Sequence, residues 1–225
     1  MHRSDVSLYG HLTLDRVFID FKEYRTLGAI GNVWWSLLKL DSSLCVDLKP
    51  SSFGEAIILV DKAKKTRQGR GILNLKTIKP QVSNAGWHHI AYLNQIEDPS
   101  FIEEIRNATI SADITSGKKN HISFLKYVDY FFISDEDLFM PLEELTSLVK
   151  GWVILHFPSG SIITNGDETY RTKVEIIDNI NVLGAGDILA ASFIFEKIRN
   201  SHLDIADSIK QAHKHATRIL SEKNE

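Results

Sequence analysis

A short glycine-rich turn followed by an aspartate stands late in the chain. It lies within the stretch NVLGAGDILAASFIF and comprises Gly184, Ala185, Gly186 and Asp187. Glycine leaves backbone amides uncovered by side chains, and the first amides of a helix have no partners within that helix. The helix dipole adds partial positive charge at the same end. The sequence therefore predicts an anion hole, suited to a phosphate, with a carboxylate beside it.

Asp187 is a candidate base for phosphoryl transfer. The positive end of the helix should favour its ionised form, which could accept a proton from a hydroxyl lying between it and the phosphate. Phosphoryl transfer depends mainly on positioning and on stabilising charge, so a carboxylate base suffices. A plain helix-capping turn is the alternative interpretation, because turns rich in glycine and aspartate are common.

Two helices at the end of the chain should position this turn. Apolar residues over 188–195 cover most of the circumference of a helix, which predicts that it is deeply buried. The last helix, over 203–219, carries one apolar stripe at three- and four-residue steps. His213 and His215 lie two apart on it and do not share a face, so they are expected on the surface.

The rest of the chain alternates short apolar runs with amphipathic stretches, as α/β proteins do. Strands are predicted at 6–15, 43–48, 87–95, 108–114, 127–134, 152–157, 161–165 and 172–178. Further helices are predicted at 31–40, 51–65, 99–107 and 135–150. Asp113 ends one predicted strand and is interpreted as a strand-end cap in preference to a cleft residue.

Composition excludes several classes of protein. The 225 residues carry 29 acidic and 26 basic side chains and a net charge of −3, without the basic excess of a nucleic-acid-binding protein. Cys45 is the only cysteine, so no internal disulfide can form. No apolar run approaches the roughly 20 residues of a membrane span, and the first residues lack the apolar core of a signal peptide. A cytoplasmic protein without membrane or nucleic-acid partners is expected.

The glycine-rich turn with its aspartate, at 184–187, resembles a motif of the ribokinase-like, PfkB-type carbohydrate kinases. In that family the motif lies near the C-terminus and begins a buried helix. YGHLTLDRVF, at 9–18, resembles the first strand of that family, whose terminal aspartate binds sugar hydroxyls and is Asp15 here. LGAIGNVWWSLLKL, at 27–40, resembles the glycine-rich segment that lines the sugar pocket. Its substrate-binding residues would be Gly28, Gly31 and Asn32. The asparagine usual in this segment is replaced by Val33, unless Asn32 substitutes for it from the neighbouring position.

The resemblance extends to the nucleotide side, with several departures. YFFISDEDL, at 130–138, resembles the metal-and-phosphate motif, but Ser134 and Asp137 replace its asparagine and glutamate. ATRIL, at 216–220, resembles the closing helix beside the adenine, where His213 would border the nucleotide. In the nucleotide-binding turn, a threonine and spaced glycines are replaced by His156, Phe157, Pro158, Ser159 and Gly160. Before the late glycines, an aspartate and threonine pair is replaced by Asn181, Val182 and Leu183.

The resemblance implies one three-layer α/β/α domain over 1–225, with a central, mostly parallel sheet and a reduced lid around 16–28. A reduced lid excludes water poorly, and a second subunit could complete it. A homodimer through the lid region is therefore a hypothesis. Trp34, Trp35 and Trp87 could supply contact surface, although core positions are the preferred interpretation for all three.

The implied activity is transfer of the γ-phosphate of ATP, with Mg²⁺, to a sugar or nucleoside hydroxyl. Asp187 would be the base and Gly184, Ala185 and Gly186 the anion hole. Asp137 would hold the metal. The nucleotide-binding residues would be Ser134, His156, Ser159, Gly160 and His213. The altered nucleotide turn and metal motif leave a second hypothesis open, a non-catalytic sugar- or nucleotide-binding sensor on the same fold.

Overall fold

The computed structural model describes residues 3–19, 22–61, 66–115, 121–176 and 183–223. Its strands are β1 (Ser4–Ile19), β2 (Lys22–Leu27), β3 (Val46–Asp61), β4 (Thr66–Thr77), β5 (Ala85–Ile90), β6 (Thr109–Asp113), β7 (Tyr130–Ser134), β8 (Trp152–Phe157), β9 (Gly160–Thr164) and β10 (Thr169–Lys173). Its α-helices are α1 (Ala29–Leu40), α2 (Leu142–Leu148), α3 (Ala185–Arg199) and α4 (Ile205–Lys223). Its 3₁₀ segments are η1 (Leu93–Gln95), η2 (Ser100–Glu104) and η3 (Ile122–Tyr127).

The strands form one ten-stranded sheet in the order β10-β9-β8-β7-β6-β5-β1-β3-β4, with β2 paired to β1. The central pairs, from β3 across β1, β5, β6 and β7 to β8, are parallel. The outer pairs are antiparallel. Parallel strands place their carboxyl ends at one edge of a sheet, which is where ligands of such folds bind. The predicted mostly parallel sheet is confirmed.

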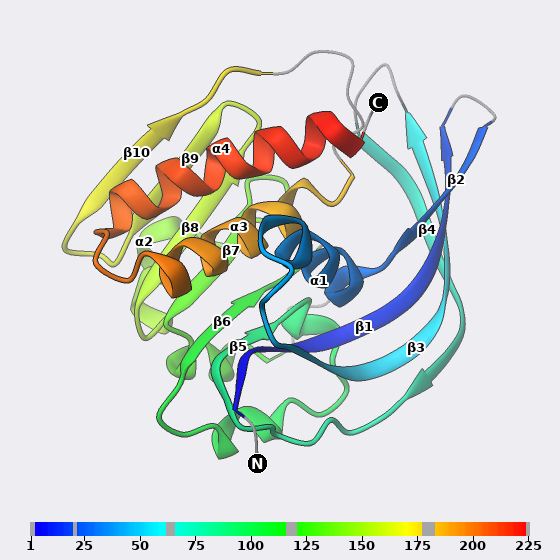
Figure 1. Cartoon of the computed structure of the whole chain (residues 1–225), viewed down its shortest axis with the longest axis horizontal. Helices are drawn as coiled ribbons and strands as arrows, with labels where there is room; N and C mark the ends of the chain where they lie inside the picture. The colour runs from blue at the N-terminus through cyan, green and yellow to red at the C-terminus, as the bar shows by residue number, and fades with distance from the viewer. Residues whose placement is uncertain (1–2, 20–21, 62–65, 116–120, 177–182, 224–225) are drawn as a thin grey trace.

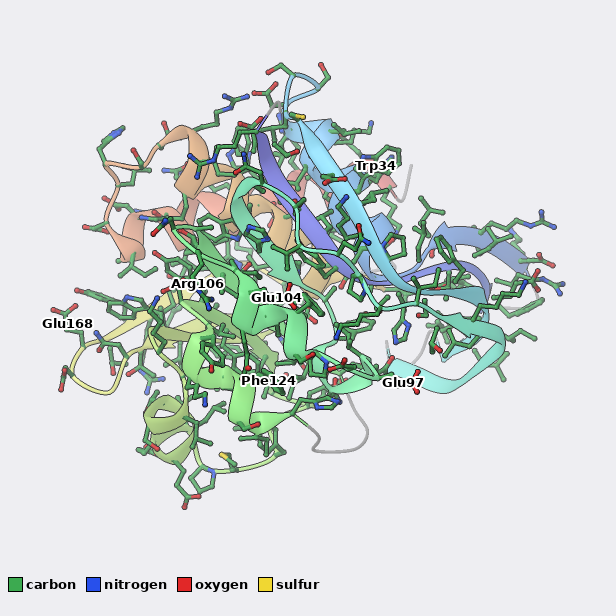
Figure 2. All side chains as sticks on the ribbon, turned by 90° about the horizontal axis from the view of Figure 1, so that it is seen from below. Trp34, Glu97, Glu104, Arg106, Phe124 and Glu168 are labelled. Atoms are coloured by element: carbon green, nitrogen blue, oxygen red, sulfur yellow. The ribbon has the colours of Figure 1, made fainter. Side chains whose placement is uncertain are left out.

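Helical segments cover both faces of this sheet. One face carries α1, α3 and α4, which Figure 1 shows packed together across the strands, and their apolar residues form a single core cluster with Phe132 and Ile154. The opposite face carries η2, η3 and α2, and Figure 2 shows Glu104 and Phe124 on these short segments. Within β7, Phe131 and Ile133 contact the second cluster while Phe132 contacts the first, as the alternation of a strand requires.

The predicted helix at 51–65 is wrong, because β3 continues through this stretch to Asp61. Ala56 and Ile58 are buried, whereas Glu55 and Leu59 are exposed, which is the two-residue period of a strand. The β-branched residues Ile57, Ile58 and Val60 also favour a strand over a helix. Residues 62–65 lie outside the described part of the chain.

Two other predicted helices are shorter in the structure. The helix at 99–107 is only the 3₁₀ segment η2, and the helix at 135–150 is only α2. Pro141 directly precedes α2, and a proline disfavours the helical conformation in the residue before it, here Met140. The strand at 172–178 is β10, which begins and ends earlier than predicted; residues 177 and 178 lie outside the described part.

β1 and β3 extend beyond the main sheet and, together with β2 and β4, form a four-stranded arm. β1 does not end at Asp15 but pairs with β2 and β3 as far as Ile19. β4 completes the arm on the other side of β3, and Figure 1 shows these strands curving away from the helices. Its small apolar cluster of Val17, Ala56 and Ile58 packs against Leu183. The lid predicted at 16–28 falls in this arm, which also includes β3 and β4.

The tryptophans lie largely inside the protein. Trp87 is buried, stacks on Tyr130 at 5.4 Å between ring centroids, and donates its indole N–H to Ser111 Oγ at 2.8 Å. The core interpretation of Trp87 is therefore confirmed. Trp34 and Trp35 on α1 are partly buried against the cluster beneath α3 and α4. None of the described helices is both long and apolar enough to cross a membrane.

Candidate active site

The glycine turn lies where predicted, at the start of the buried helix α3. Gly184 caps the helix in the left-handed conformation, with φ of 79°, which favours glycine. The helix is buried on almost all sides, as its apolar circumference predicts. A side chain at Gly186 would meet the His156 ring, because an added Cβ would lie 3.2 Å from Cε1. Glycine at position 186 therefore leaves room for the neighbouring imidazole.

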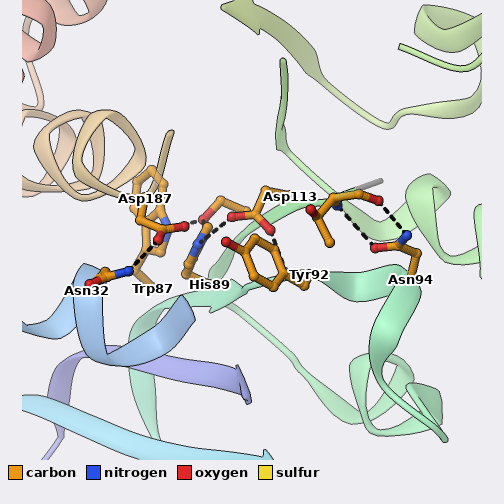
Figure 3. Close-up of polar contacts among 9 residues, drawn as sticks. Asn32, Trp87, His89, Tyr92, Asn94, Asp113 and Asp187 are labelled. Carbon is orange, nitrogen blue, oxygen red and sulfur yellow. Dashed lines mark hydrogen bonds and ion pairs between the residues drawn. The ribbon is translucent and has the colours of Figure 1, made fainter. Parts of the chain in front are cut away.

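Asp187 is held by a residue from the first helix of the chain. Asn32 Nδ2, on α1, donates a hydrogen bond to Asp187 Oδ2 at 2.8 Å, and Figure 3 shows the two side chains facing each other. Asp187 is only 3% exposed. Gly184 lies beside the same amide, since an added Cβ there would lie 3.3 Å from Asn32 Nδ2. Val33 is buried in the core, and Asn32 is the residue of this pair that reaches the site.

Burial raises the pKa of Asp187 to about 7, and the charges of Asp113 and Asp15 act in the same direction. The hydrogen bond from Asn32 and the charge of Lys223 oppose this rise. From the sequence, the helix N-terminus was expected to favour the ionised form. The structure corrects this expectation, because loss of solvation and repulsion from like charges outweigh the dipole at this buried position.

Asp113 lies at the end of β6, close to Asp187. Its carboxylate accepts the backbone N–H of Tyr92, a residue with φ of 55°, so the cap interpretation of Asp113 is correct. His89 Nε2 lies 3.6 Å from Asp113 Oδ2, and His89 Nδ1 hydrogen-bonds Ser111 Oγ at 2.9 Å. Figure 3 shows Asp113 and Asp187 in one row of polar side chains above His89. Asp113 is thus both a cap and a charged neighbour of the candidate base.

Asp15 lies on β1 where the arm leaves the main sheet. It is 5% exposed, and its Oδ1 accepts a hydrogen bond from Thr13 Oγ1 at 2.6 Å. Gly28 lies directly against this pair, because an added Cβ would fall 2.0 Å from Thr13 Oγ1. Gly31 lies against Leu27, because a Cβ added at Gly31 would fall 2.3 Å from the Cβ of Leu27. The two glycines thus let α1 start close to β1 and β2.

We expect Gly28→Ala to destabilise the protein by about 1–3 kcal/mol, the usual cost of overpacking. The new methyl group displaces the Thr13 hydroxyl from Asp15, so Gly28→Ala should cost less in a Thr13→Ala background. Urea unfolding of the four variants in this cycle measures the coupling. Additive effects of the two substitutions would contradict the proposed contact.

Ser134 and Asp137 lie together at the end of β7, where Ser134 Oγ donates to Asp137 Oδ2 at 3.4 Å. Asp137 is partly exposed. No cluster of three metal-binding side chains occurs among the described residues. Mg²⁺ bound together with phosphates needs only one or two carboxylates, with water and phosphate oxygens as its other ligands. A single carboxylate at this place fits that kind of metal binding.

The other residues predicted to bind the nucleotide lie in or near the turn after β8. Ser159 is exposed in that turn, whereas His156 contacts α3 through Gly186. Gly160 has φ of 145° and lies against β10, since an added Cβ would come 1.9 Å from the Thr172 carbonyl oxygen. His213 is buried and hydrogen-bonds Ser161 Oγ at 2.9 Å, so its predicted surface position is wrong. Burial lowers the pKa of both His156 and His213 to about 4.

Lys223 is a candidate site residue that sequence reasoning missed. Its Nζ donates to the backbone oxygen of Leu183 at 3.1 Å, directly before the glycine turn. It lies 40 positions from Leu183, and no motif includes it. Asn181 and Val182, which replace the usual residues before the turn, lie outside the described part of the chain.

No protein-family model and no curated protein sequence matches the chain, whereas many solved structures match its fold. A pyrophosphate-dependent kinase in the ribokinase family is 17% identical, with a TM-score of 0.68 over 96% of this chain and 95% of that one. A probable sugar kinase from Rhizobium etli is 13% identical, with a TM-score of 0.73 over 98% and 94%. A Burkholderia thailandensis nucleoside kinase with inosine is 13% identical, with a TM-score of 0.70 over 96% and 91%. The match over nearly the whole length of both chains shows that this protein has the fold of the ribokinase-family kinases.

Proposed function

We propose that the protein is a carbohydrate kinase that transfers the γ-phosphoryl group of ATP, with Mg²⁺, to a hydroxyl of a sugar or sugar-like molecule. One observation carries the proposal: Asp187 is a buried carboxylate, with a pKa raised to about 7, beside the glycine turn that opens α3. A base whose pKa lies near the working pH is the most effective at removing a proton. Unpaired amides at a helix N-terminus are suited to hold a phosphate next to it.

The proposed reaction is a single in-line transfer. The acceptor hydroxyl oxygen forms a bond to the γ-phosphorus while the bond to the bridging oxygen breaks and ADP leaves. The hydroxyl proton passes to Asp187, and Asn32 orients the carboxylate through its hydrogen bond to Oδ2. The amides of the 184–186 turn stabilise charge on the transferred group. Asp137 would hold Mg²⁺ together with the donor, and the metal would neutralise phosphate charge.

Known proteins of this fold support a polyhydroxylated acceptor. One kinase is complexed with myo-inositol, one with inosine, and a third is an acarbose kinase. In this proposal Asp15, which is buried and hydrogen-bonded by Thr13, would accept hydrogen bonds from acceptor hydroxyls. A panel of neutral sugars, polyols and nucleosides with ATP·Mg²⁺ tests the proposal by detection of phosphorylated product. Because one similar kinase uses pyrophosphate, that donor belongs in the panel. Failure to phosphorylate any acceptor with either donor would contradict kinase activity.

We expect Asp15→Asn to raise the KM for the acceptor about 10- to 100-fold, the usual effect of weakening a hydrogen bond to a charged group. The donor KM should stay nearly constant, because Asp15 is assigned to the acceptor. Steady-state kinetics with each substrate varied in turn separate these effects. Asp167→Asn, at an exposed position between β9 and β10, is the matched control. Equal rises in both KM values would argue against the assignment.

A non-catalytic sensor remains the second candidate, and the His156 contact favours it. The imidazole lies against Gly186, beside the amides assigned to the phosphate. A sensor would bind a sugar but not ATP·Mg²⁺ or pyrophosphate. Calorimetry with each ligand alone distinguishes the two functions, because a kinase must bind a phosphoryl donor as well as its acceptor.

A further inference from the structure

We propose that Lys223 binds the phosphates of the donor and supplies fixed positive charge beside the glycine turn. This inference rests on the proposed kinase function and assigns one more residue to the same site. Lys223 belongs to the last turn of α4, far in sequence from the turn that it contacts. It would act on the donor by direct contact, and not through Asp187.

The ammonium group of Lys223 lies directly beside the glycine turn. Nζ lies 3.1 Å from the oxygen of Leu183, the residue that precedes the helix-capping Gly184. Leu183 itself packs against the arm residues Val17, Ala56 and Ile58, so this backbone carbonyl is held between the arm and α3. A lysine ammonium has three N–H donors. Within the described residues its one hydrogen bond goes to Leu183, which leaves two donors for a ligand.

Two carboxylates interact electrostatically with Lys223. Asp187 and Asp15 lie close enough for their charges to raise its pKa, although burial lowers that pKa overall. Asp113 adds a third carboxylate to the neighbourhood of Asp187. A phosphate chain entering this acidic neighbourhood would be repelled without nearby cations. Among the described residues, Lys223 supplies positive charge that interacts with both Asp187 and Asp15.

A purely structural role explains the geometry less well. Removing an ammonium from water is costly, and a lysine that serves only stability usually pairs directly with a carboxylate. Among the described residues, Lys223 forms no such direct ion pair and instead bonds a neutral carbonyl. The carboxylates are close enough to interact with it electrostatically but leave its remaining donors available. This arrangement suits an anionic ligand that arrives between the groups.

The test measures donor binding separately from turnover. Lys223→Met keeps the apolar stem and removes the charge, and Lys223→Arg keeps the charge. Lys214→Met, at an exposed position of the same helix, is the matched control. Calorimetry with Mg²⁺·tripolyphosphate and with ATP·Mg²⁺, without acceptor, should show about 10- to 100-fold weaker binding in the Met variant, as expected for a lost charge-assisted hydrogen bond. The Arg variant and the control should bind within a few-fold of the wild type.

Acceptor affinity and the salt dependence of donor binding distinguish a phosphate-binding role of Lys223 from a purely structural one. In Lys223→Met the acceptor Kd should stay within about twofold, and donor binding should depend less on salt than in the wild type. Wild-type donor affinity in Lys223→Met would overturn the inference, as would equal loss of donor and acceptor binding. If the wild type phosphorylates sugars and Lys223→Met binds donor normally, only this inference fails. If the wild type phosphorylates no acceptor, the proposed function fails, and phosphate binding still tests Lys223.

Discussion

Asp187→Asn should lower kcat by about 10²- to 10⁴-fold, the usual contribution of general base catalysis. The substitution keeps the size of the side chain, and its amide oxygen can still accept the hydrogen bond from Asn32, which spans 2.8 Å in the wild type. It cannot take a proton from the acceptor hydroxyl. Donor and acceptor Kd values, measured by calorimetry, should therefore remain close to those of the wild type.

The control for this experiment is again Asp167→Asn, which removes an exposed carboxylate in the turn between β9 and β10. A variant that retains wild-type kcat on an acceptor that the wild type phosphorylates would exclude Asp187 as the base. Loss of donor binding together with kcat would instead indicate that Asp187 contributes mainly to the shape of the anion hole.

The same substitution should stabilise the protein at alkaline pH. The pKa of Asp187 is about 7 in the folded state and about 3.8 as an ordinary aspartate. Between these values the folded protein retains a proton that the unfolded chain has lost, so the free energy of unfolding falls as pH rises from about 4 to about 7. Above pH 7 the penalty is constant and amounts to about 4 kcal/mol, since one pKa unit corresponds to about 1.4 kcal/mol.

The amide side chain of the Asp187→Asn variant cannot ionise, so the variant lacks this penalty. We expect it to unfold at higher urea concentration than the wild type at pH 8, and the difference to disappear near pH 4. Urea unfolding at several pH values measures both slopes. Equal pH dependence of the two proteins would show that Asp187 is not protonated in the folded state at neutral pH. The proposed base would then accept the acceptor proton without a raised pKa.

Together the two outcomes describe one physical compromise. Asp187 is buried where the start of α3 faces α1. Burial destabilises its ionised carboxylate and thereby raises its affinity for a proton. A more exposed aspartate would be less costly to the fold but a weaker base. Functional sites commonly carry such locally unfavourable groups, and their removal often stabilises the protein while it abolishes activity.

Local patterns were sufficient to predict the glycine turn of the candidate site and the buried helix that follows it. The glycine turn and the all-round apolar surface after Asp187 depend on neighbouring residues, so they are readable in the chain itself. Short apolar runs also predicted most of the strands, whereas their mostly parallel arrangement was an implication of the family resemblance. The helix at 51–65 was not correct, because a short apolar run with a glycine near its start does not distinguish a helix from a strand. Pairing of β3 with β1 and β4 decides between them.

The sequence by itself determined the central parallel sheet, the buried helix α3 and the aspartate at its start. Only the tertiary structure decided what surrounds that aspartate. Asn32 lies 155 positions from Asp187, and Asp113 and Lys223 come from other elements again. Their effects depend on distance and on exclusion of water, which no local pattern encodes. The raised pKa of Asp187 and the position of Lys223 beside the turn therefore depend on the packing of α1, β6, α3 and α4 around one buried carboxylate.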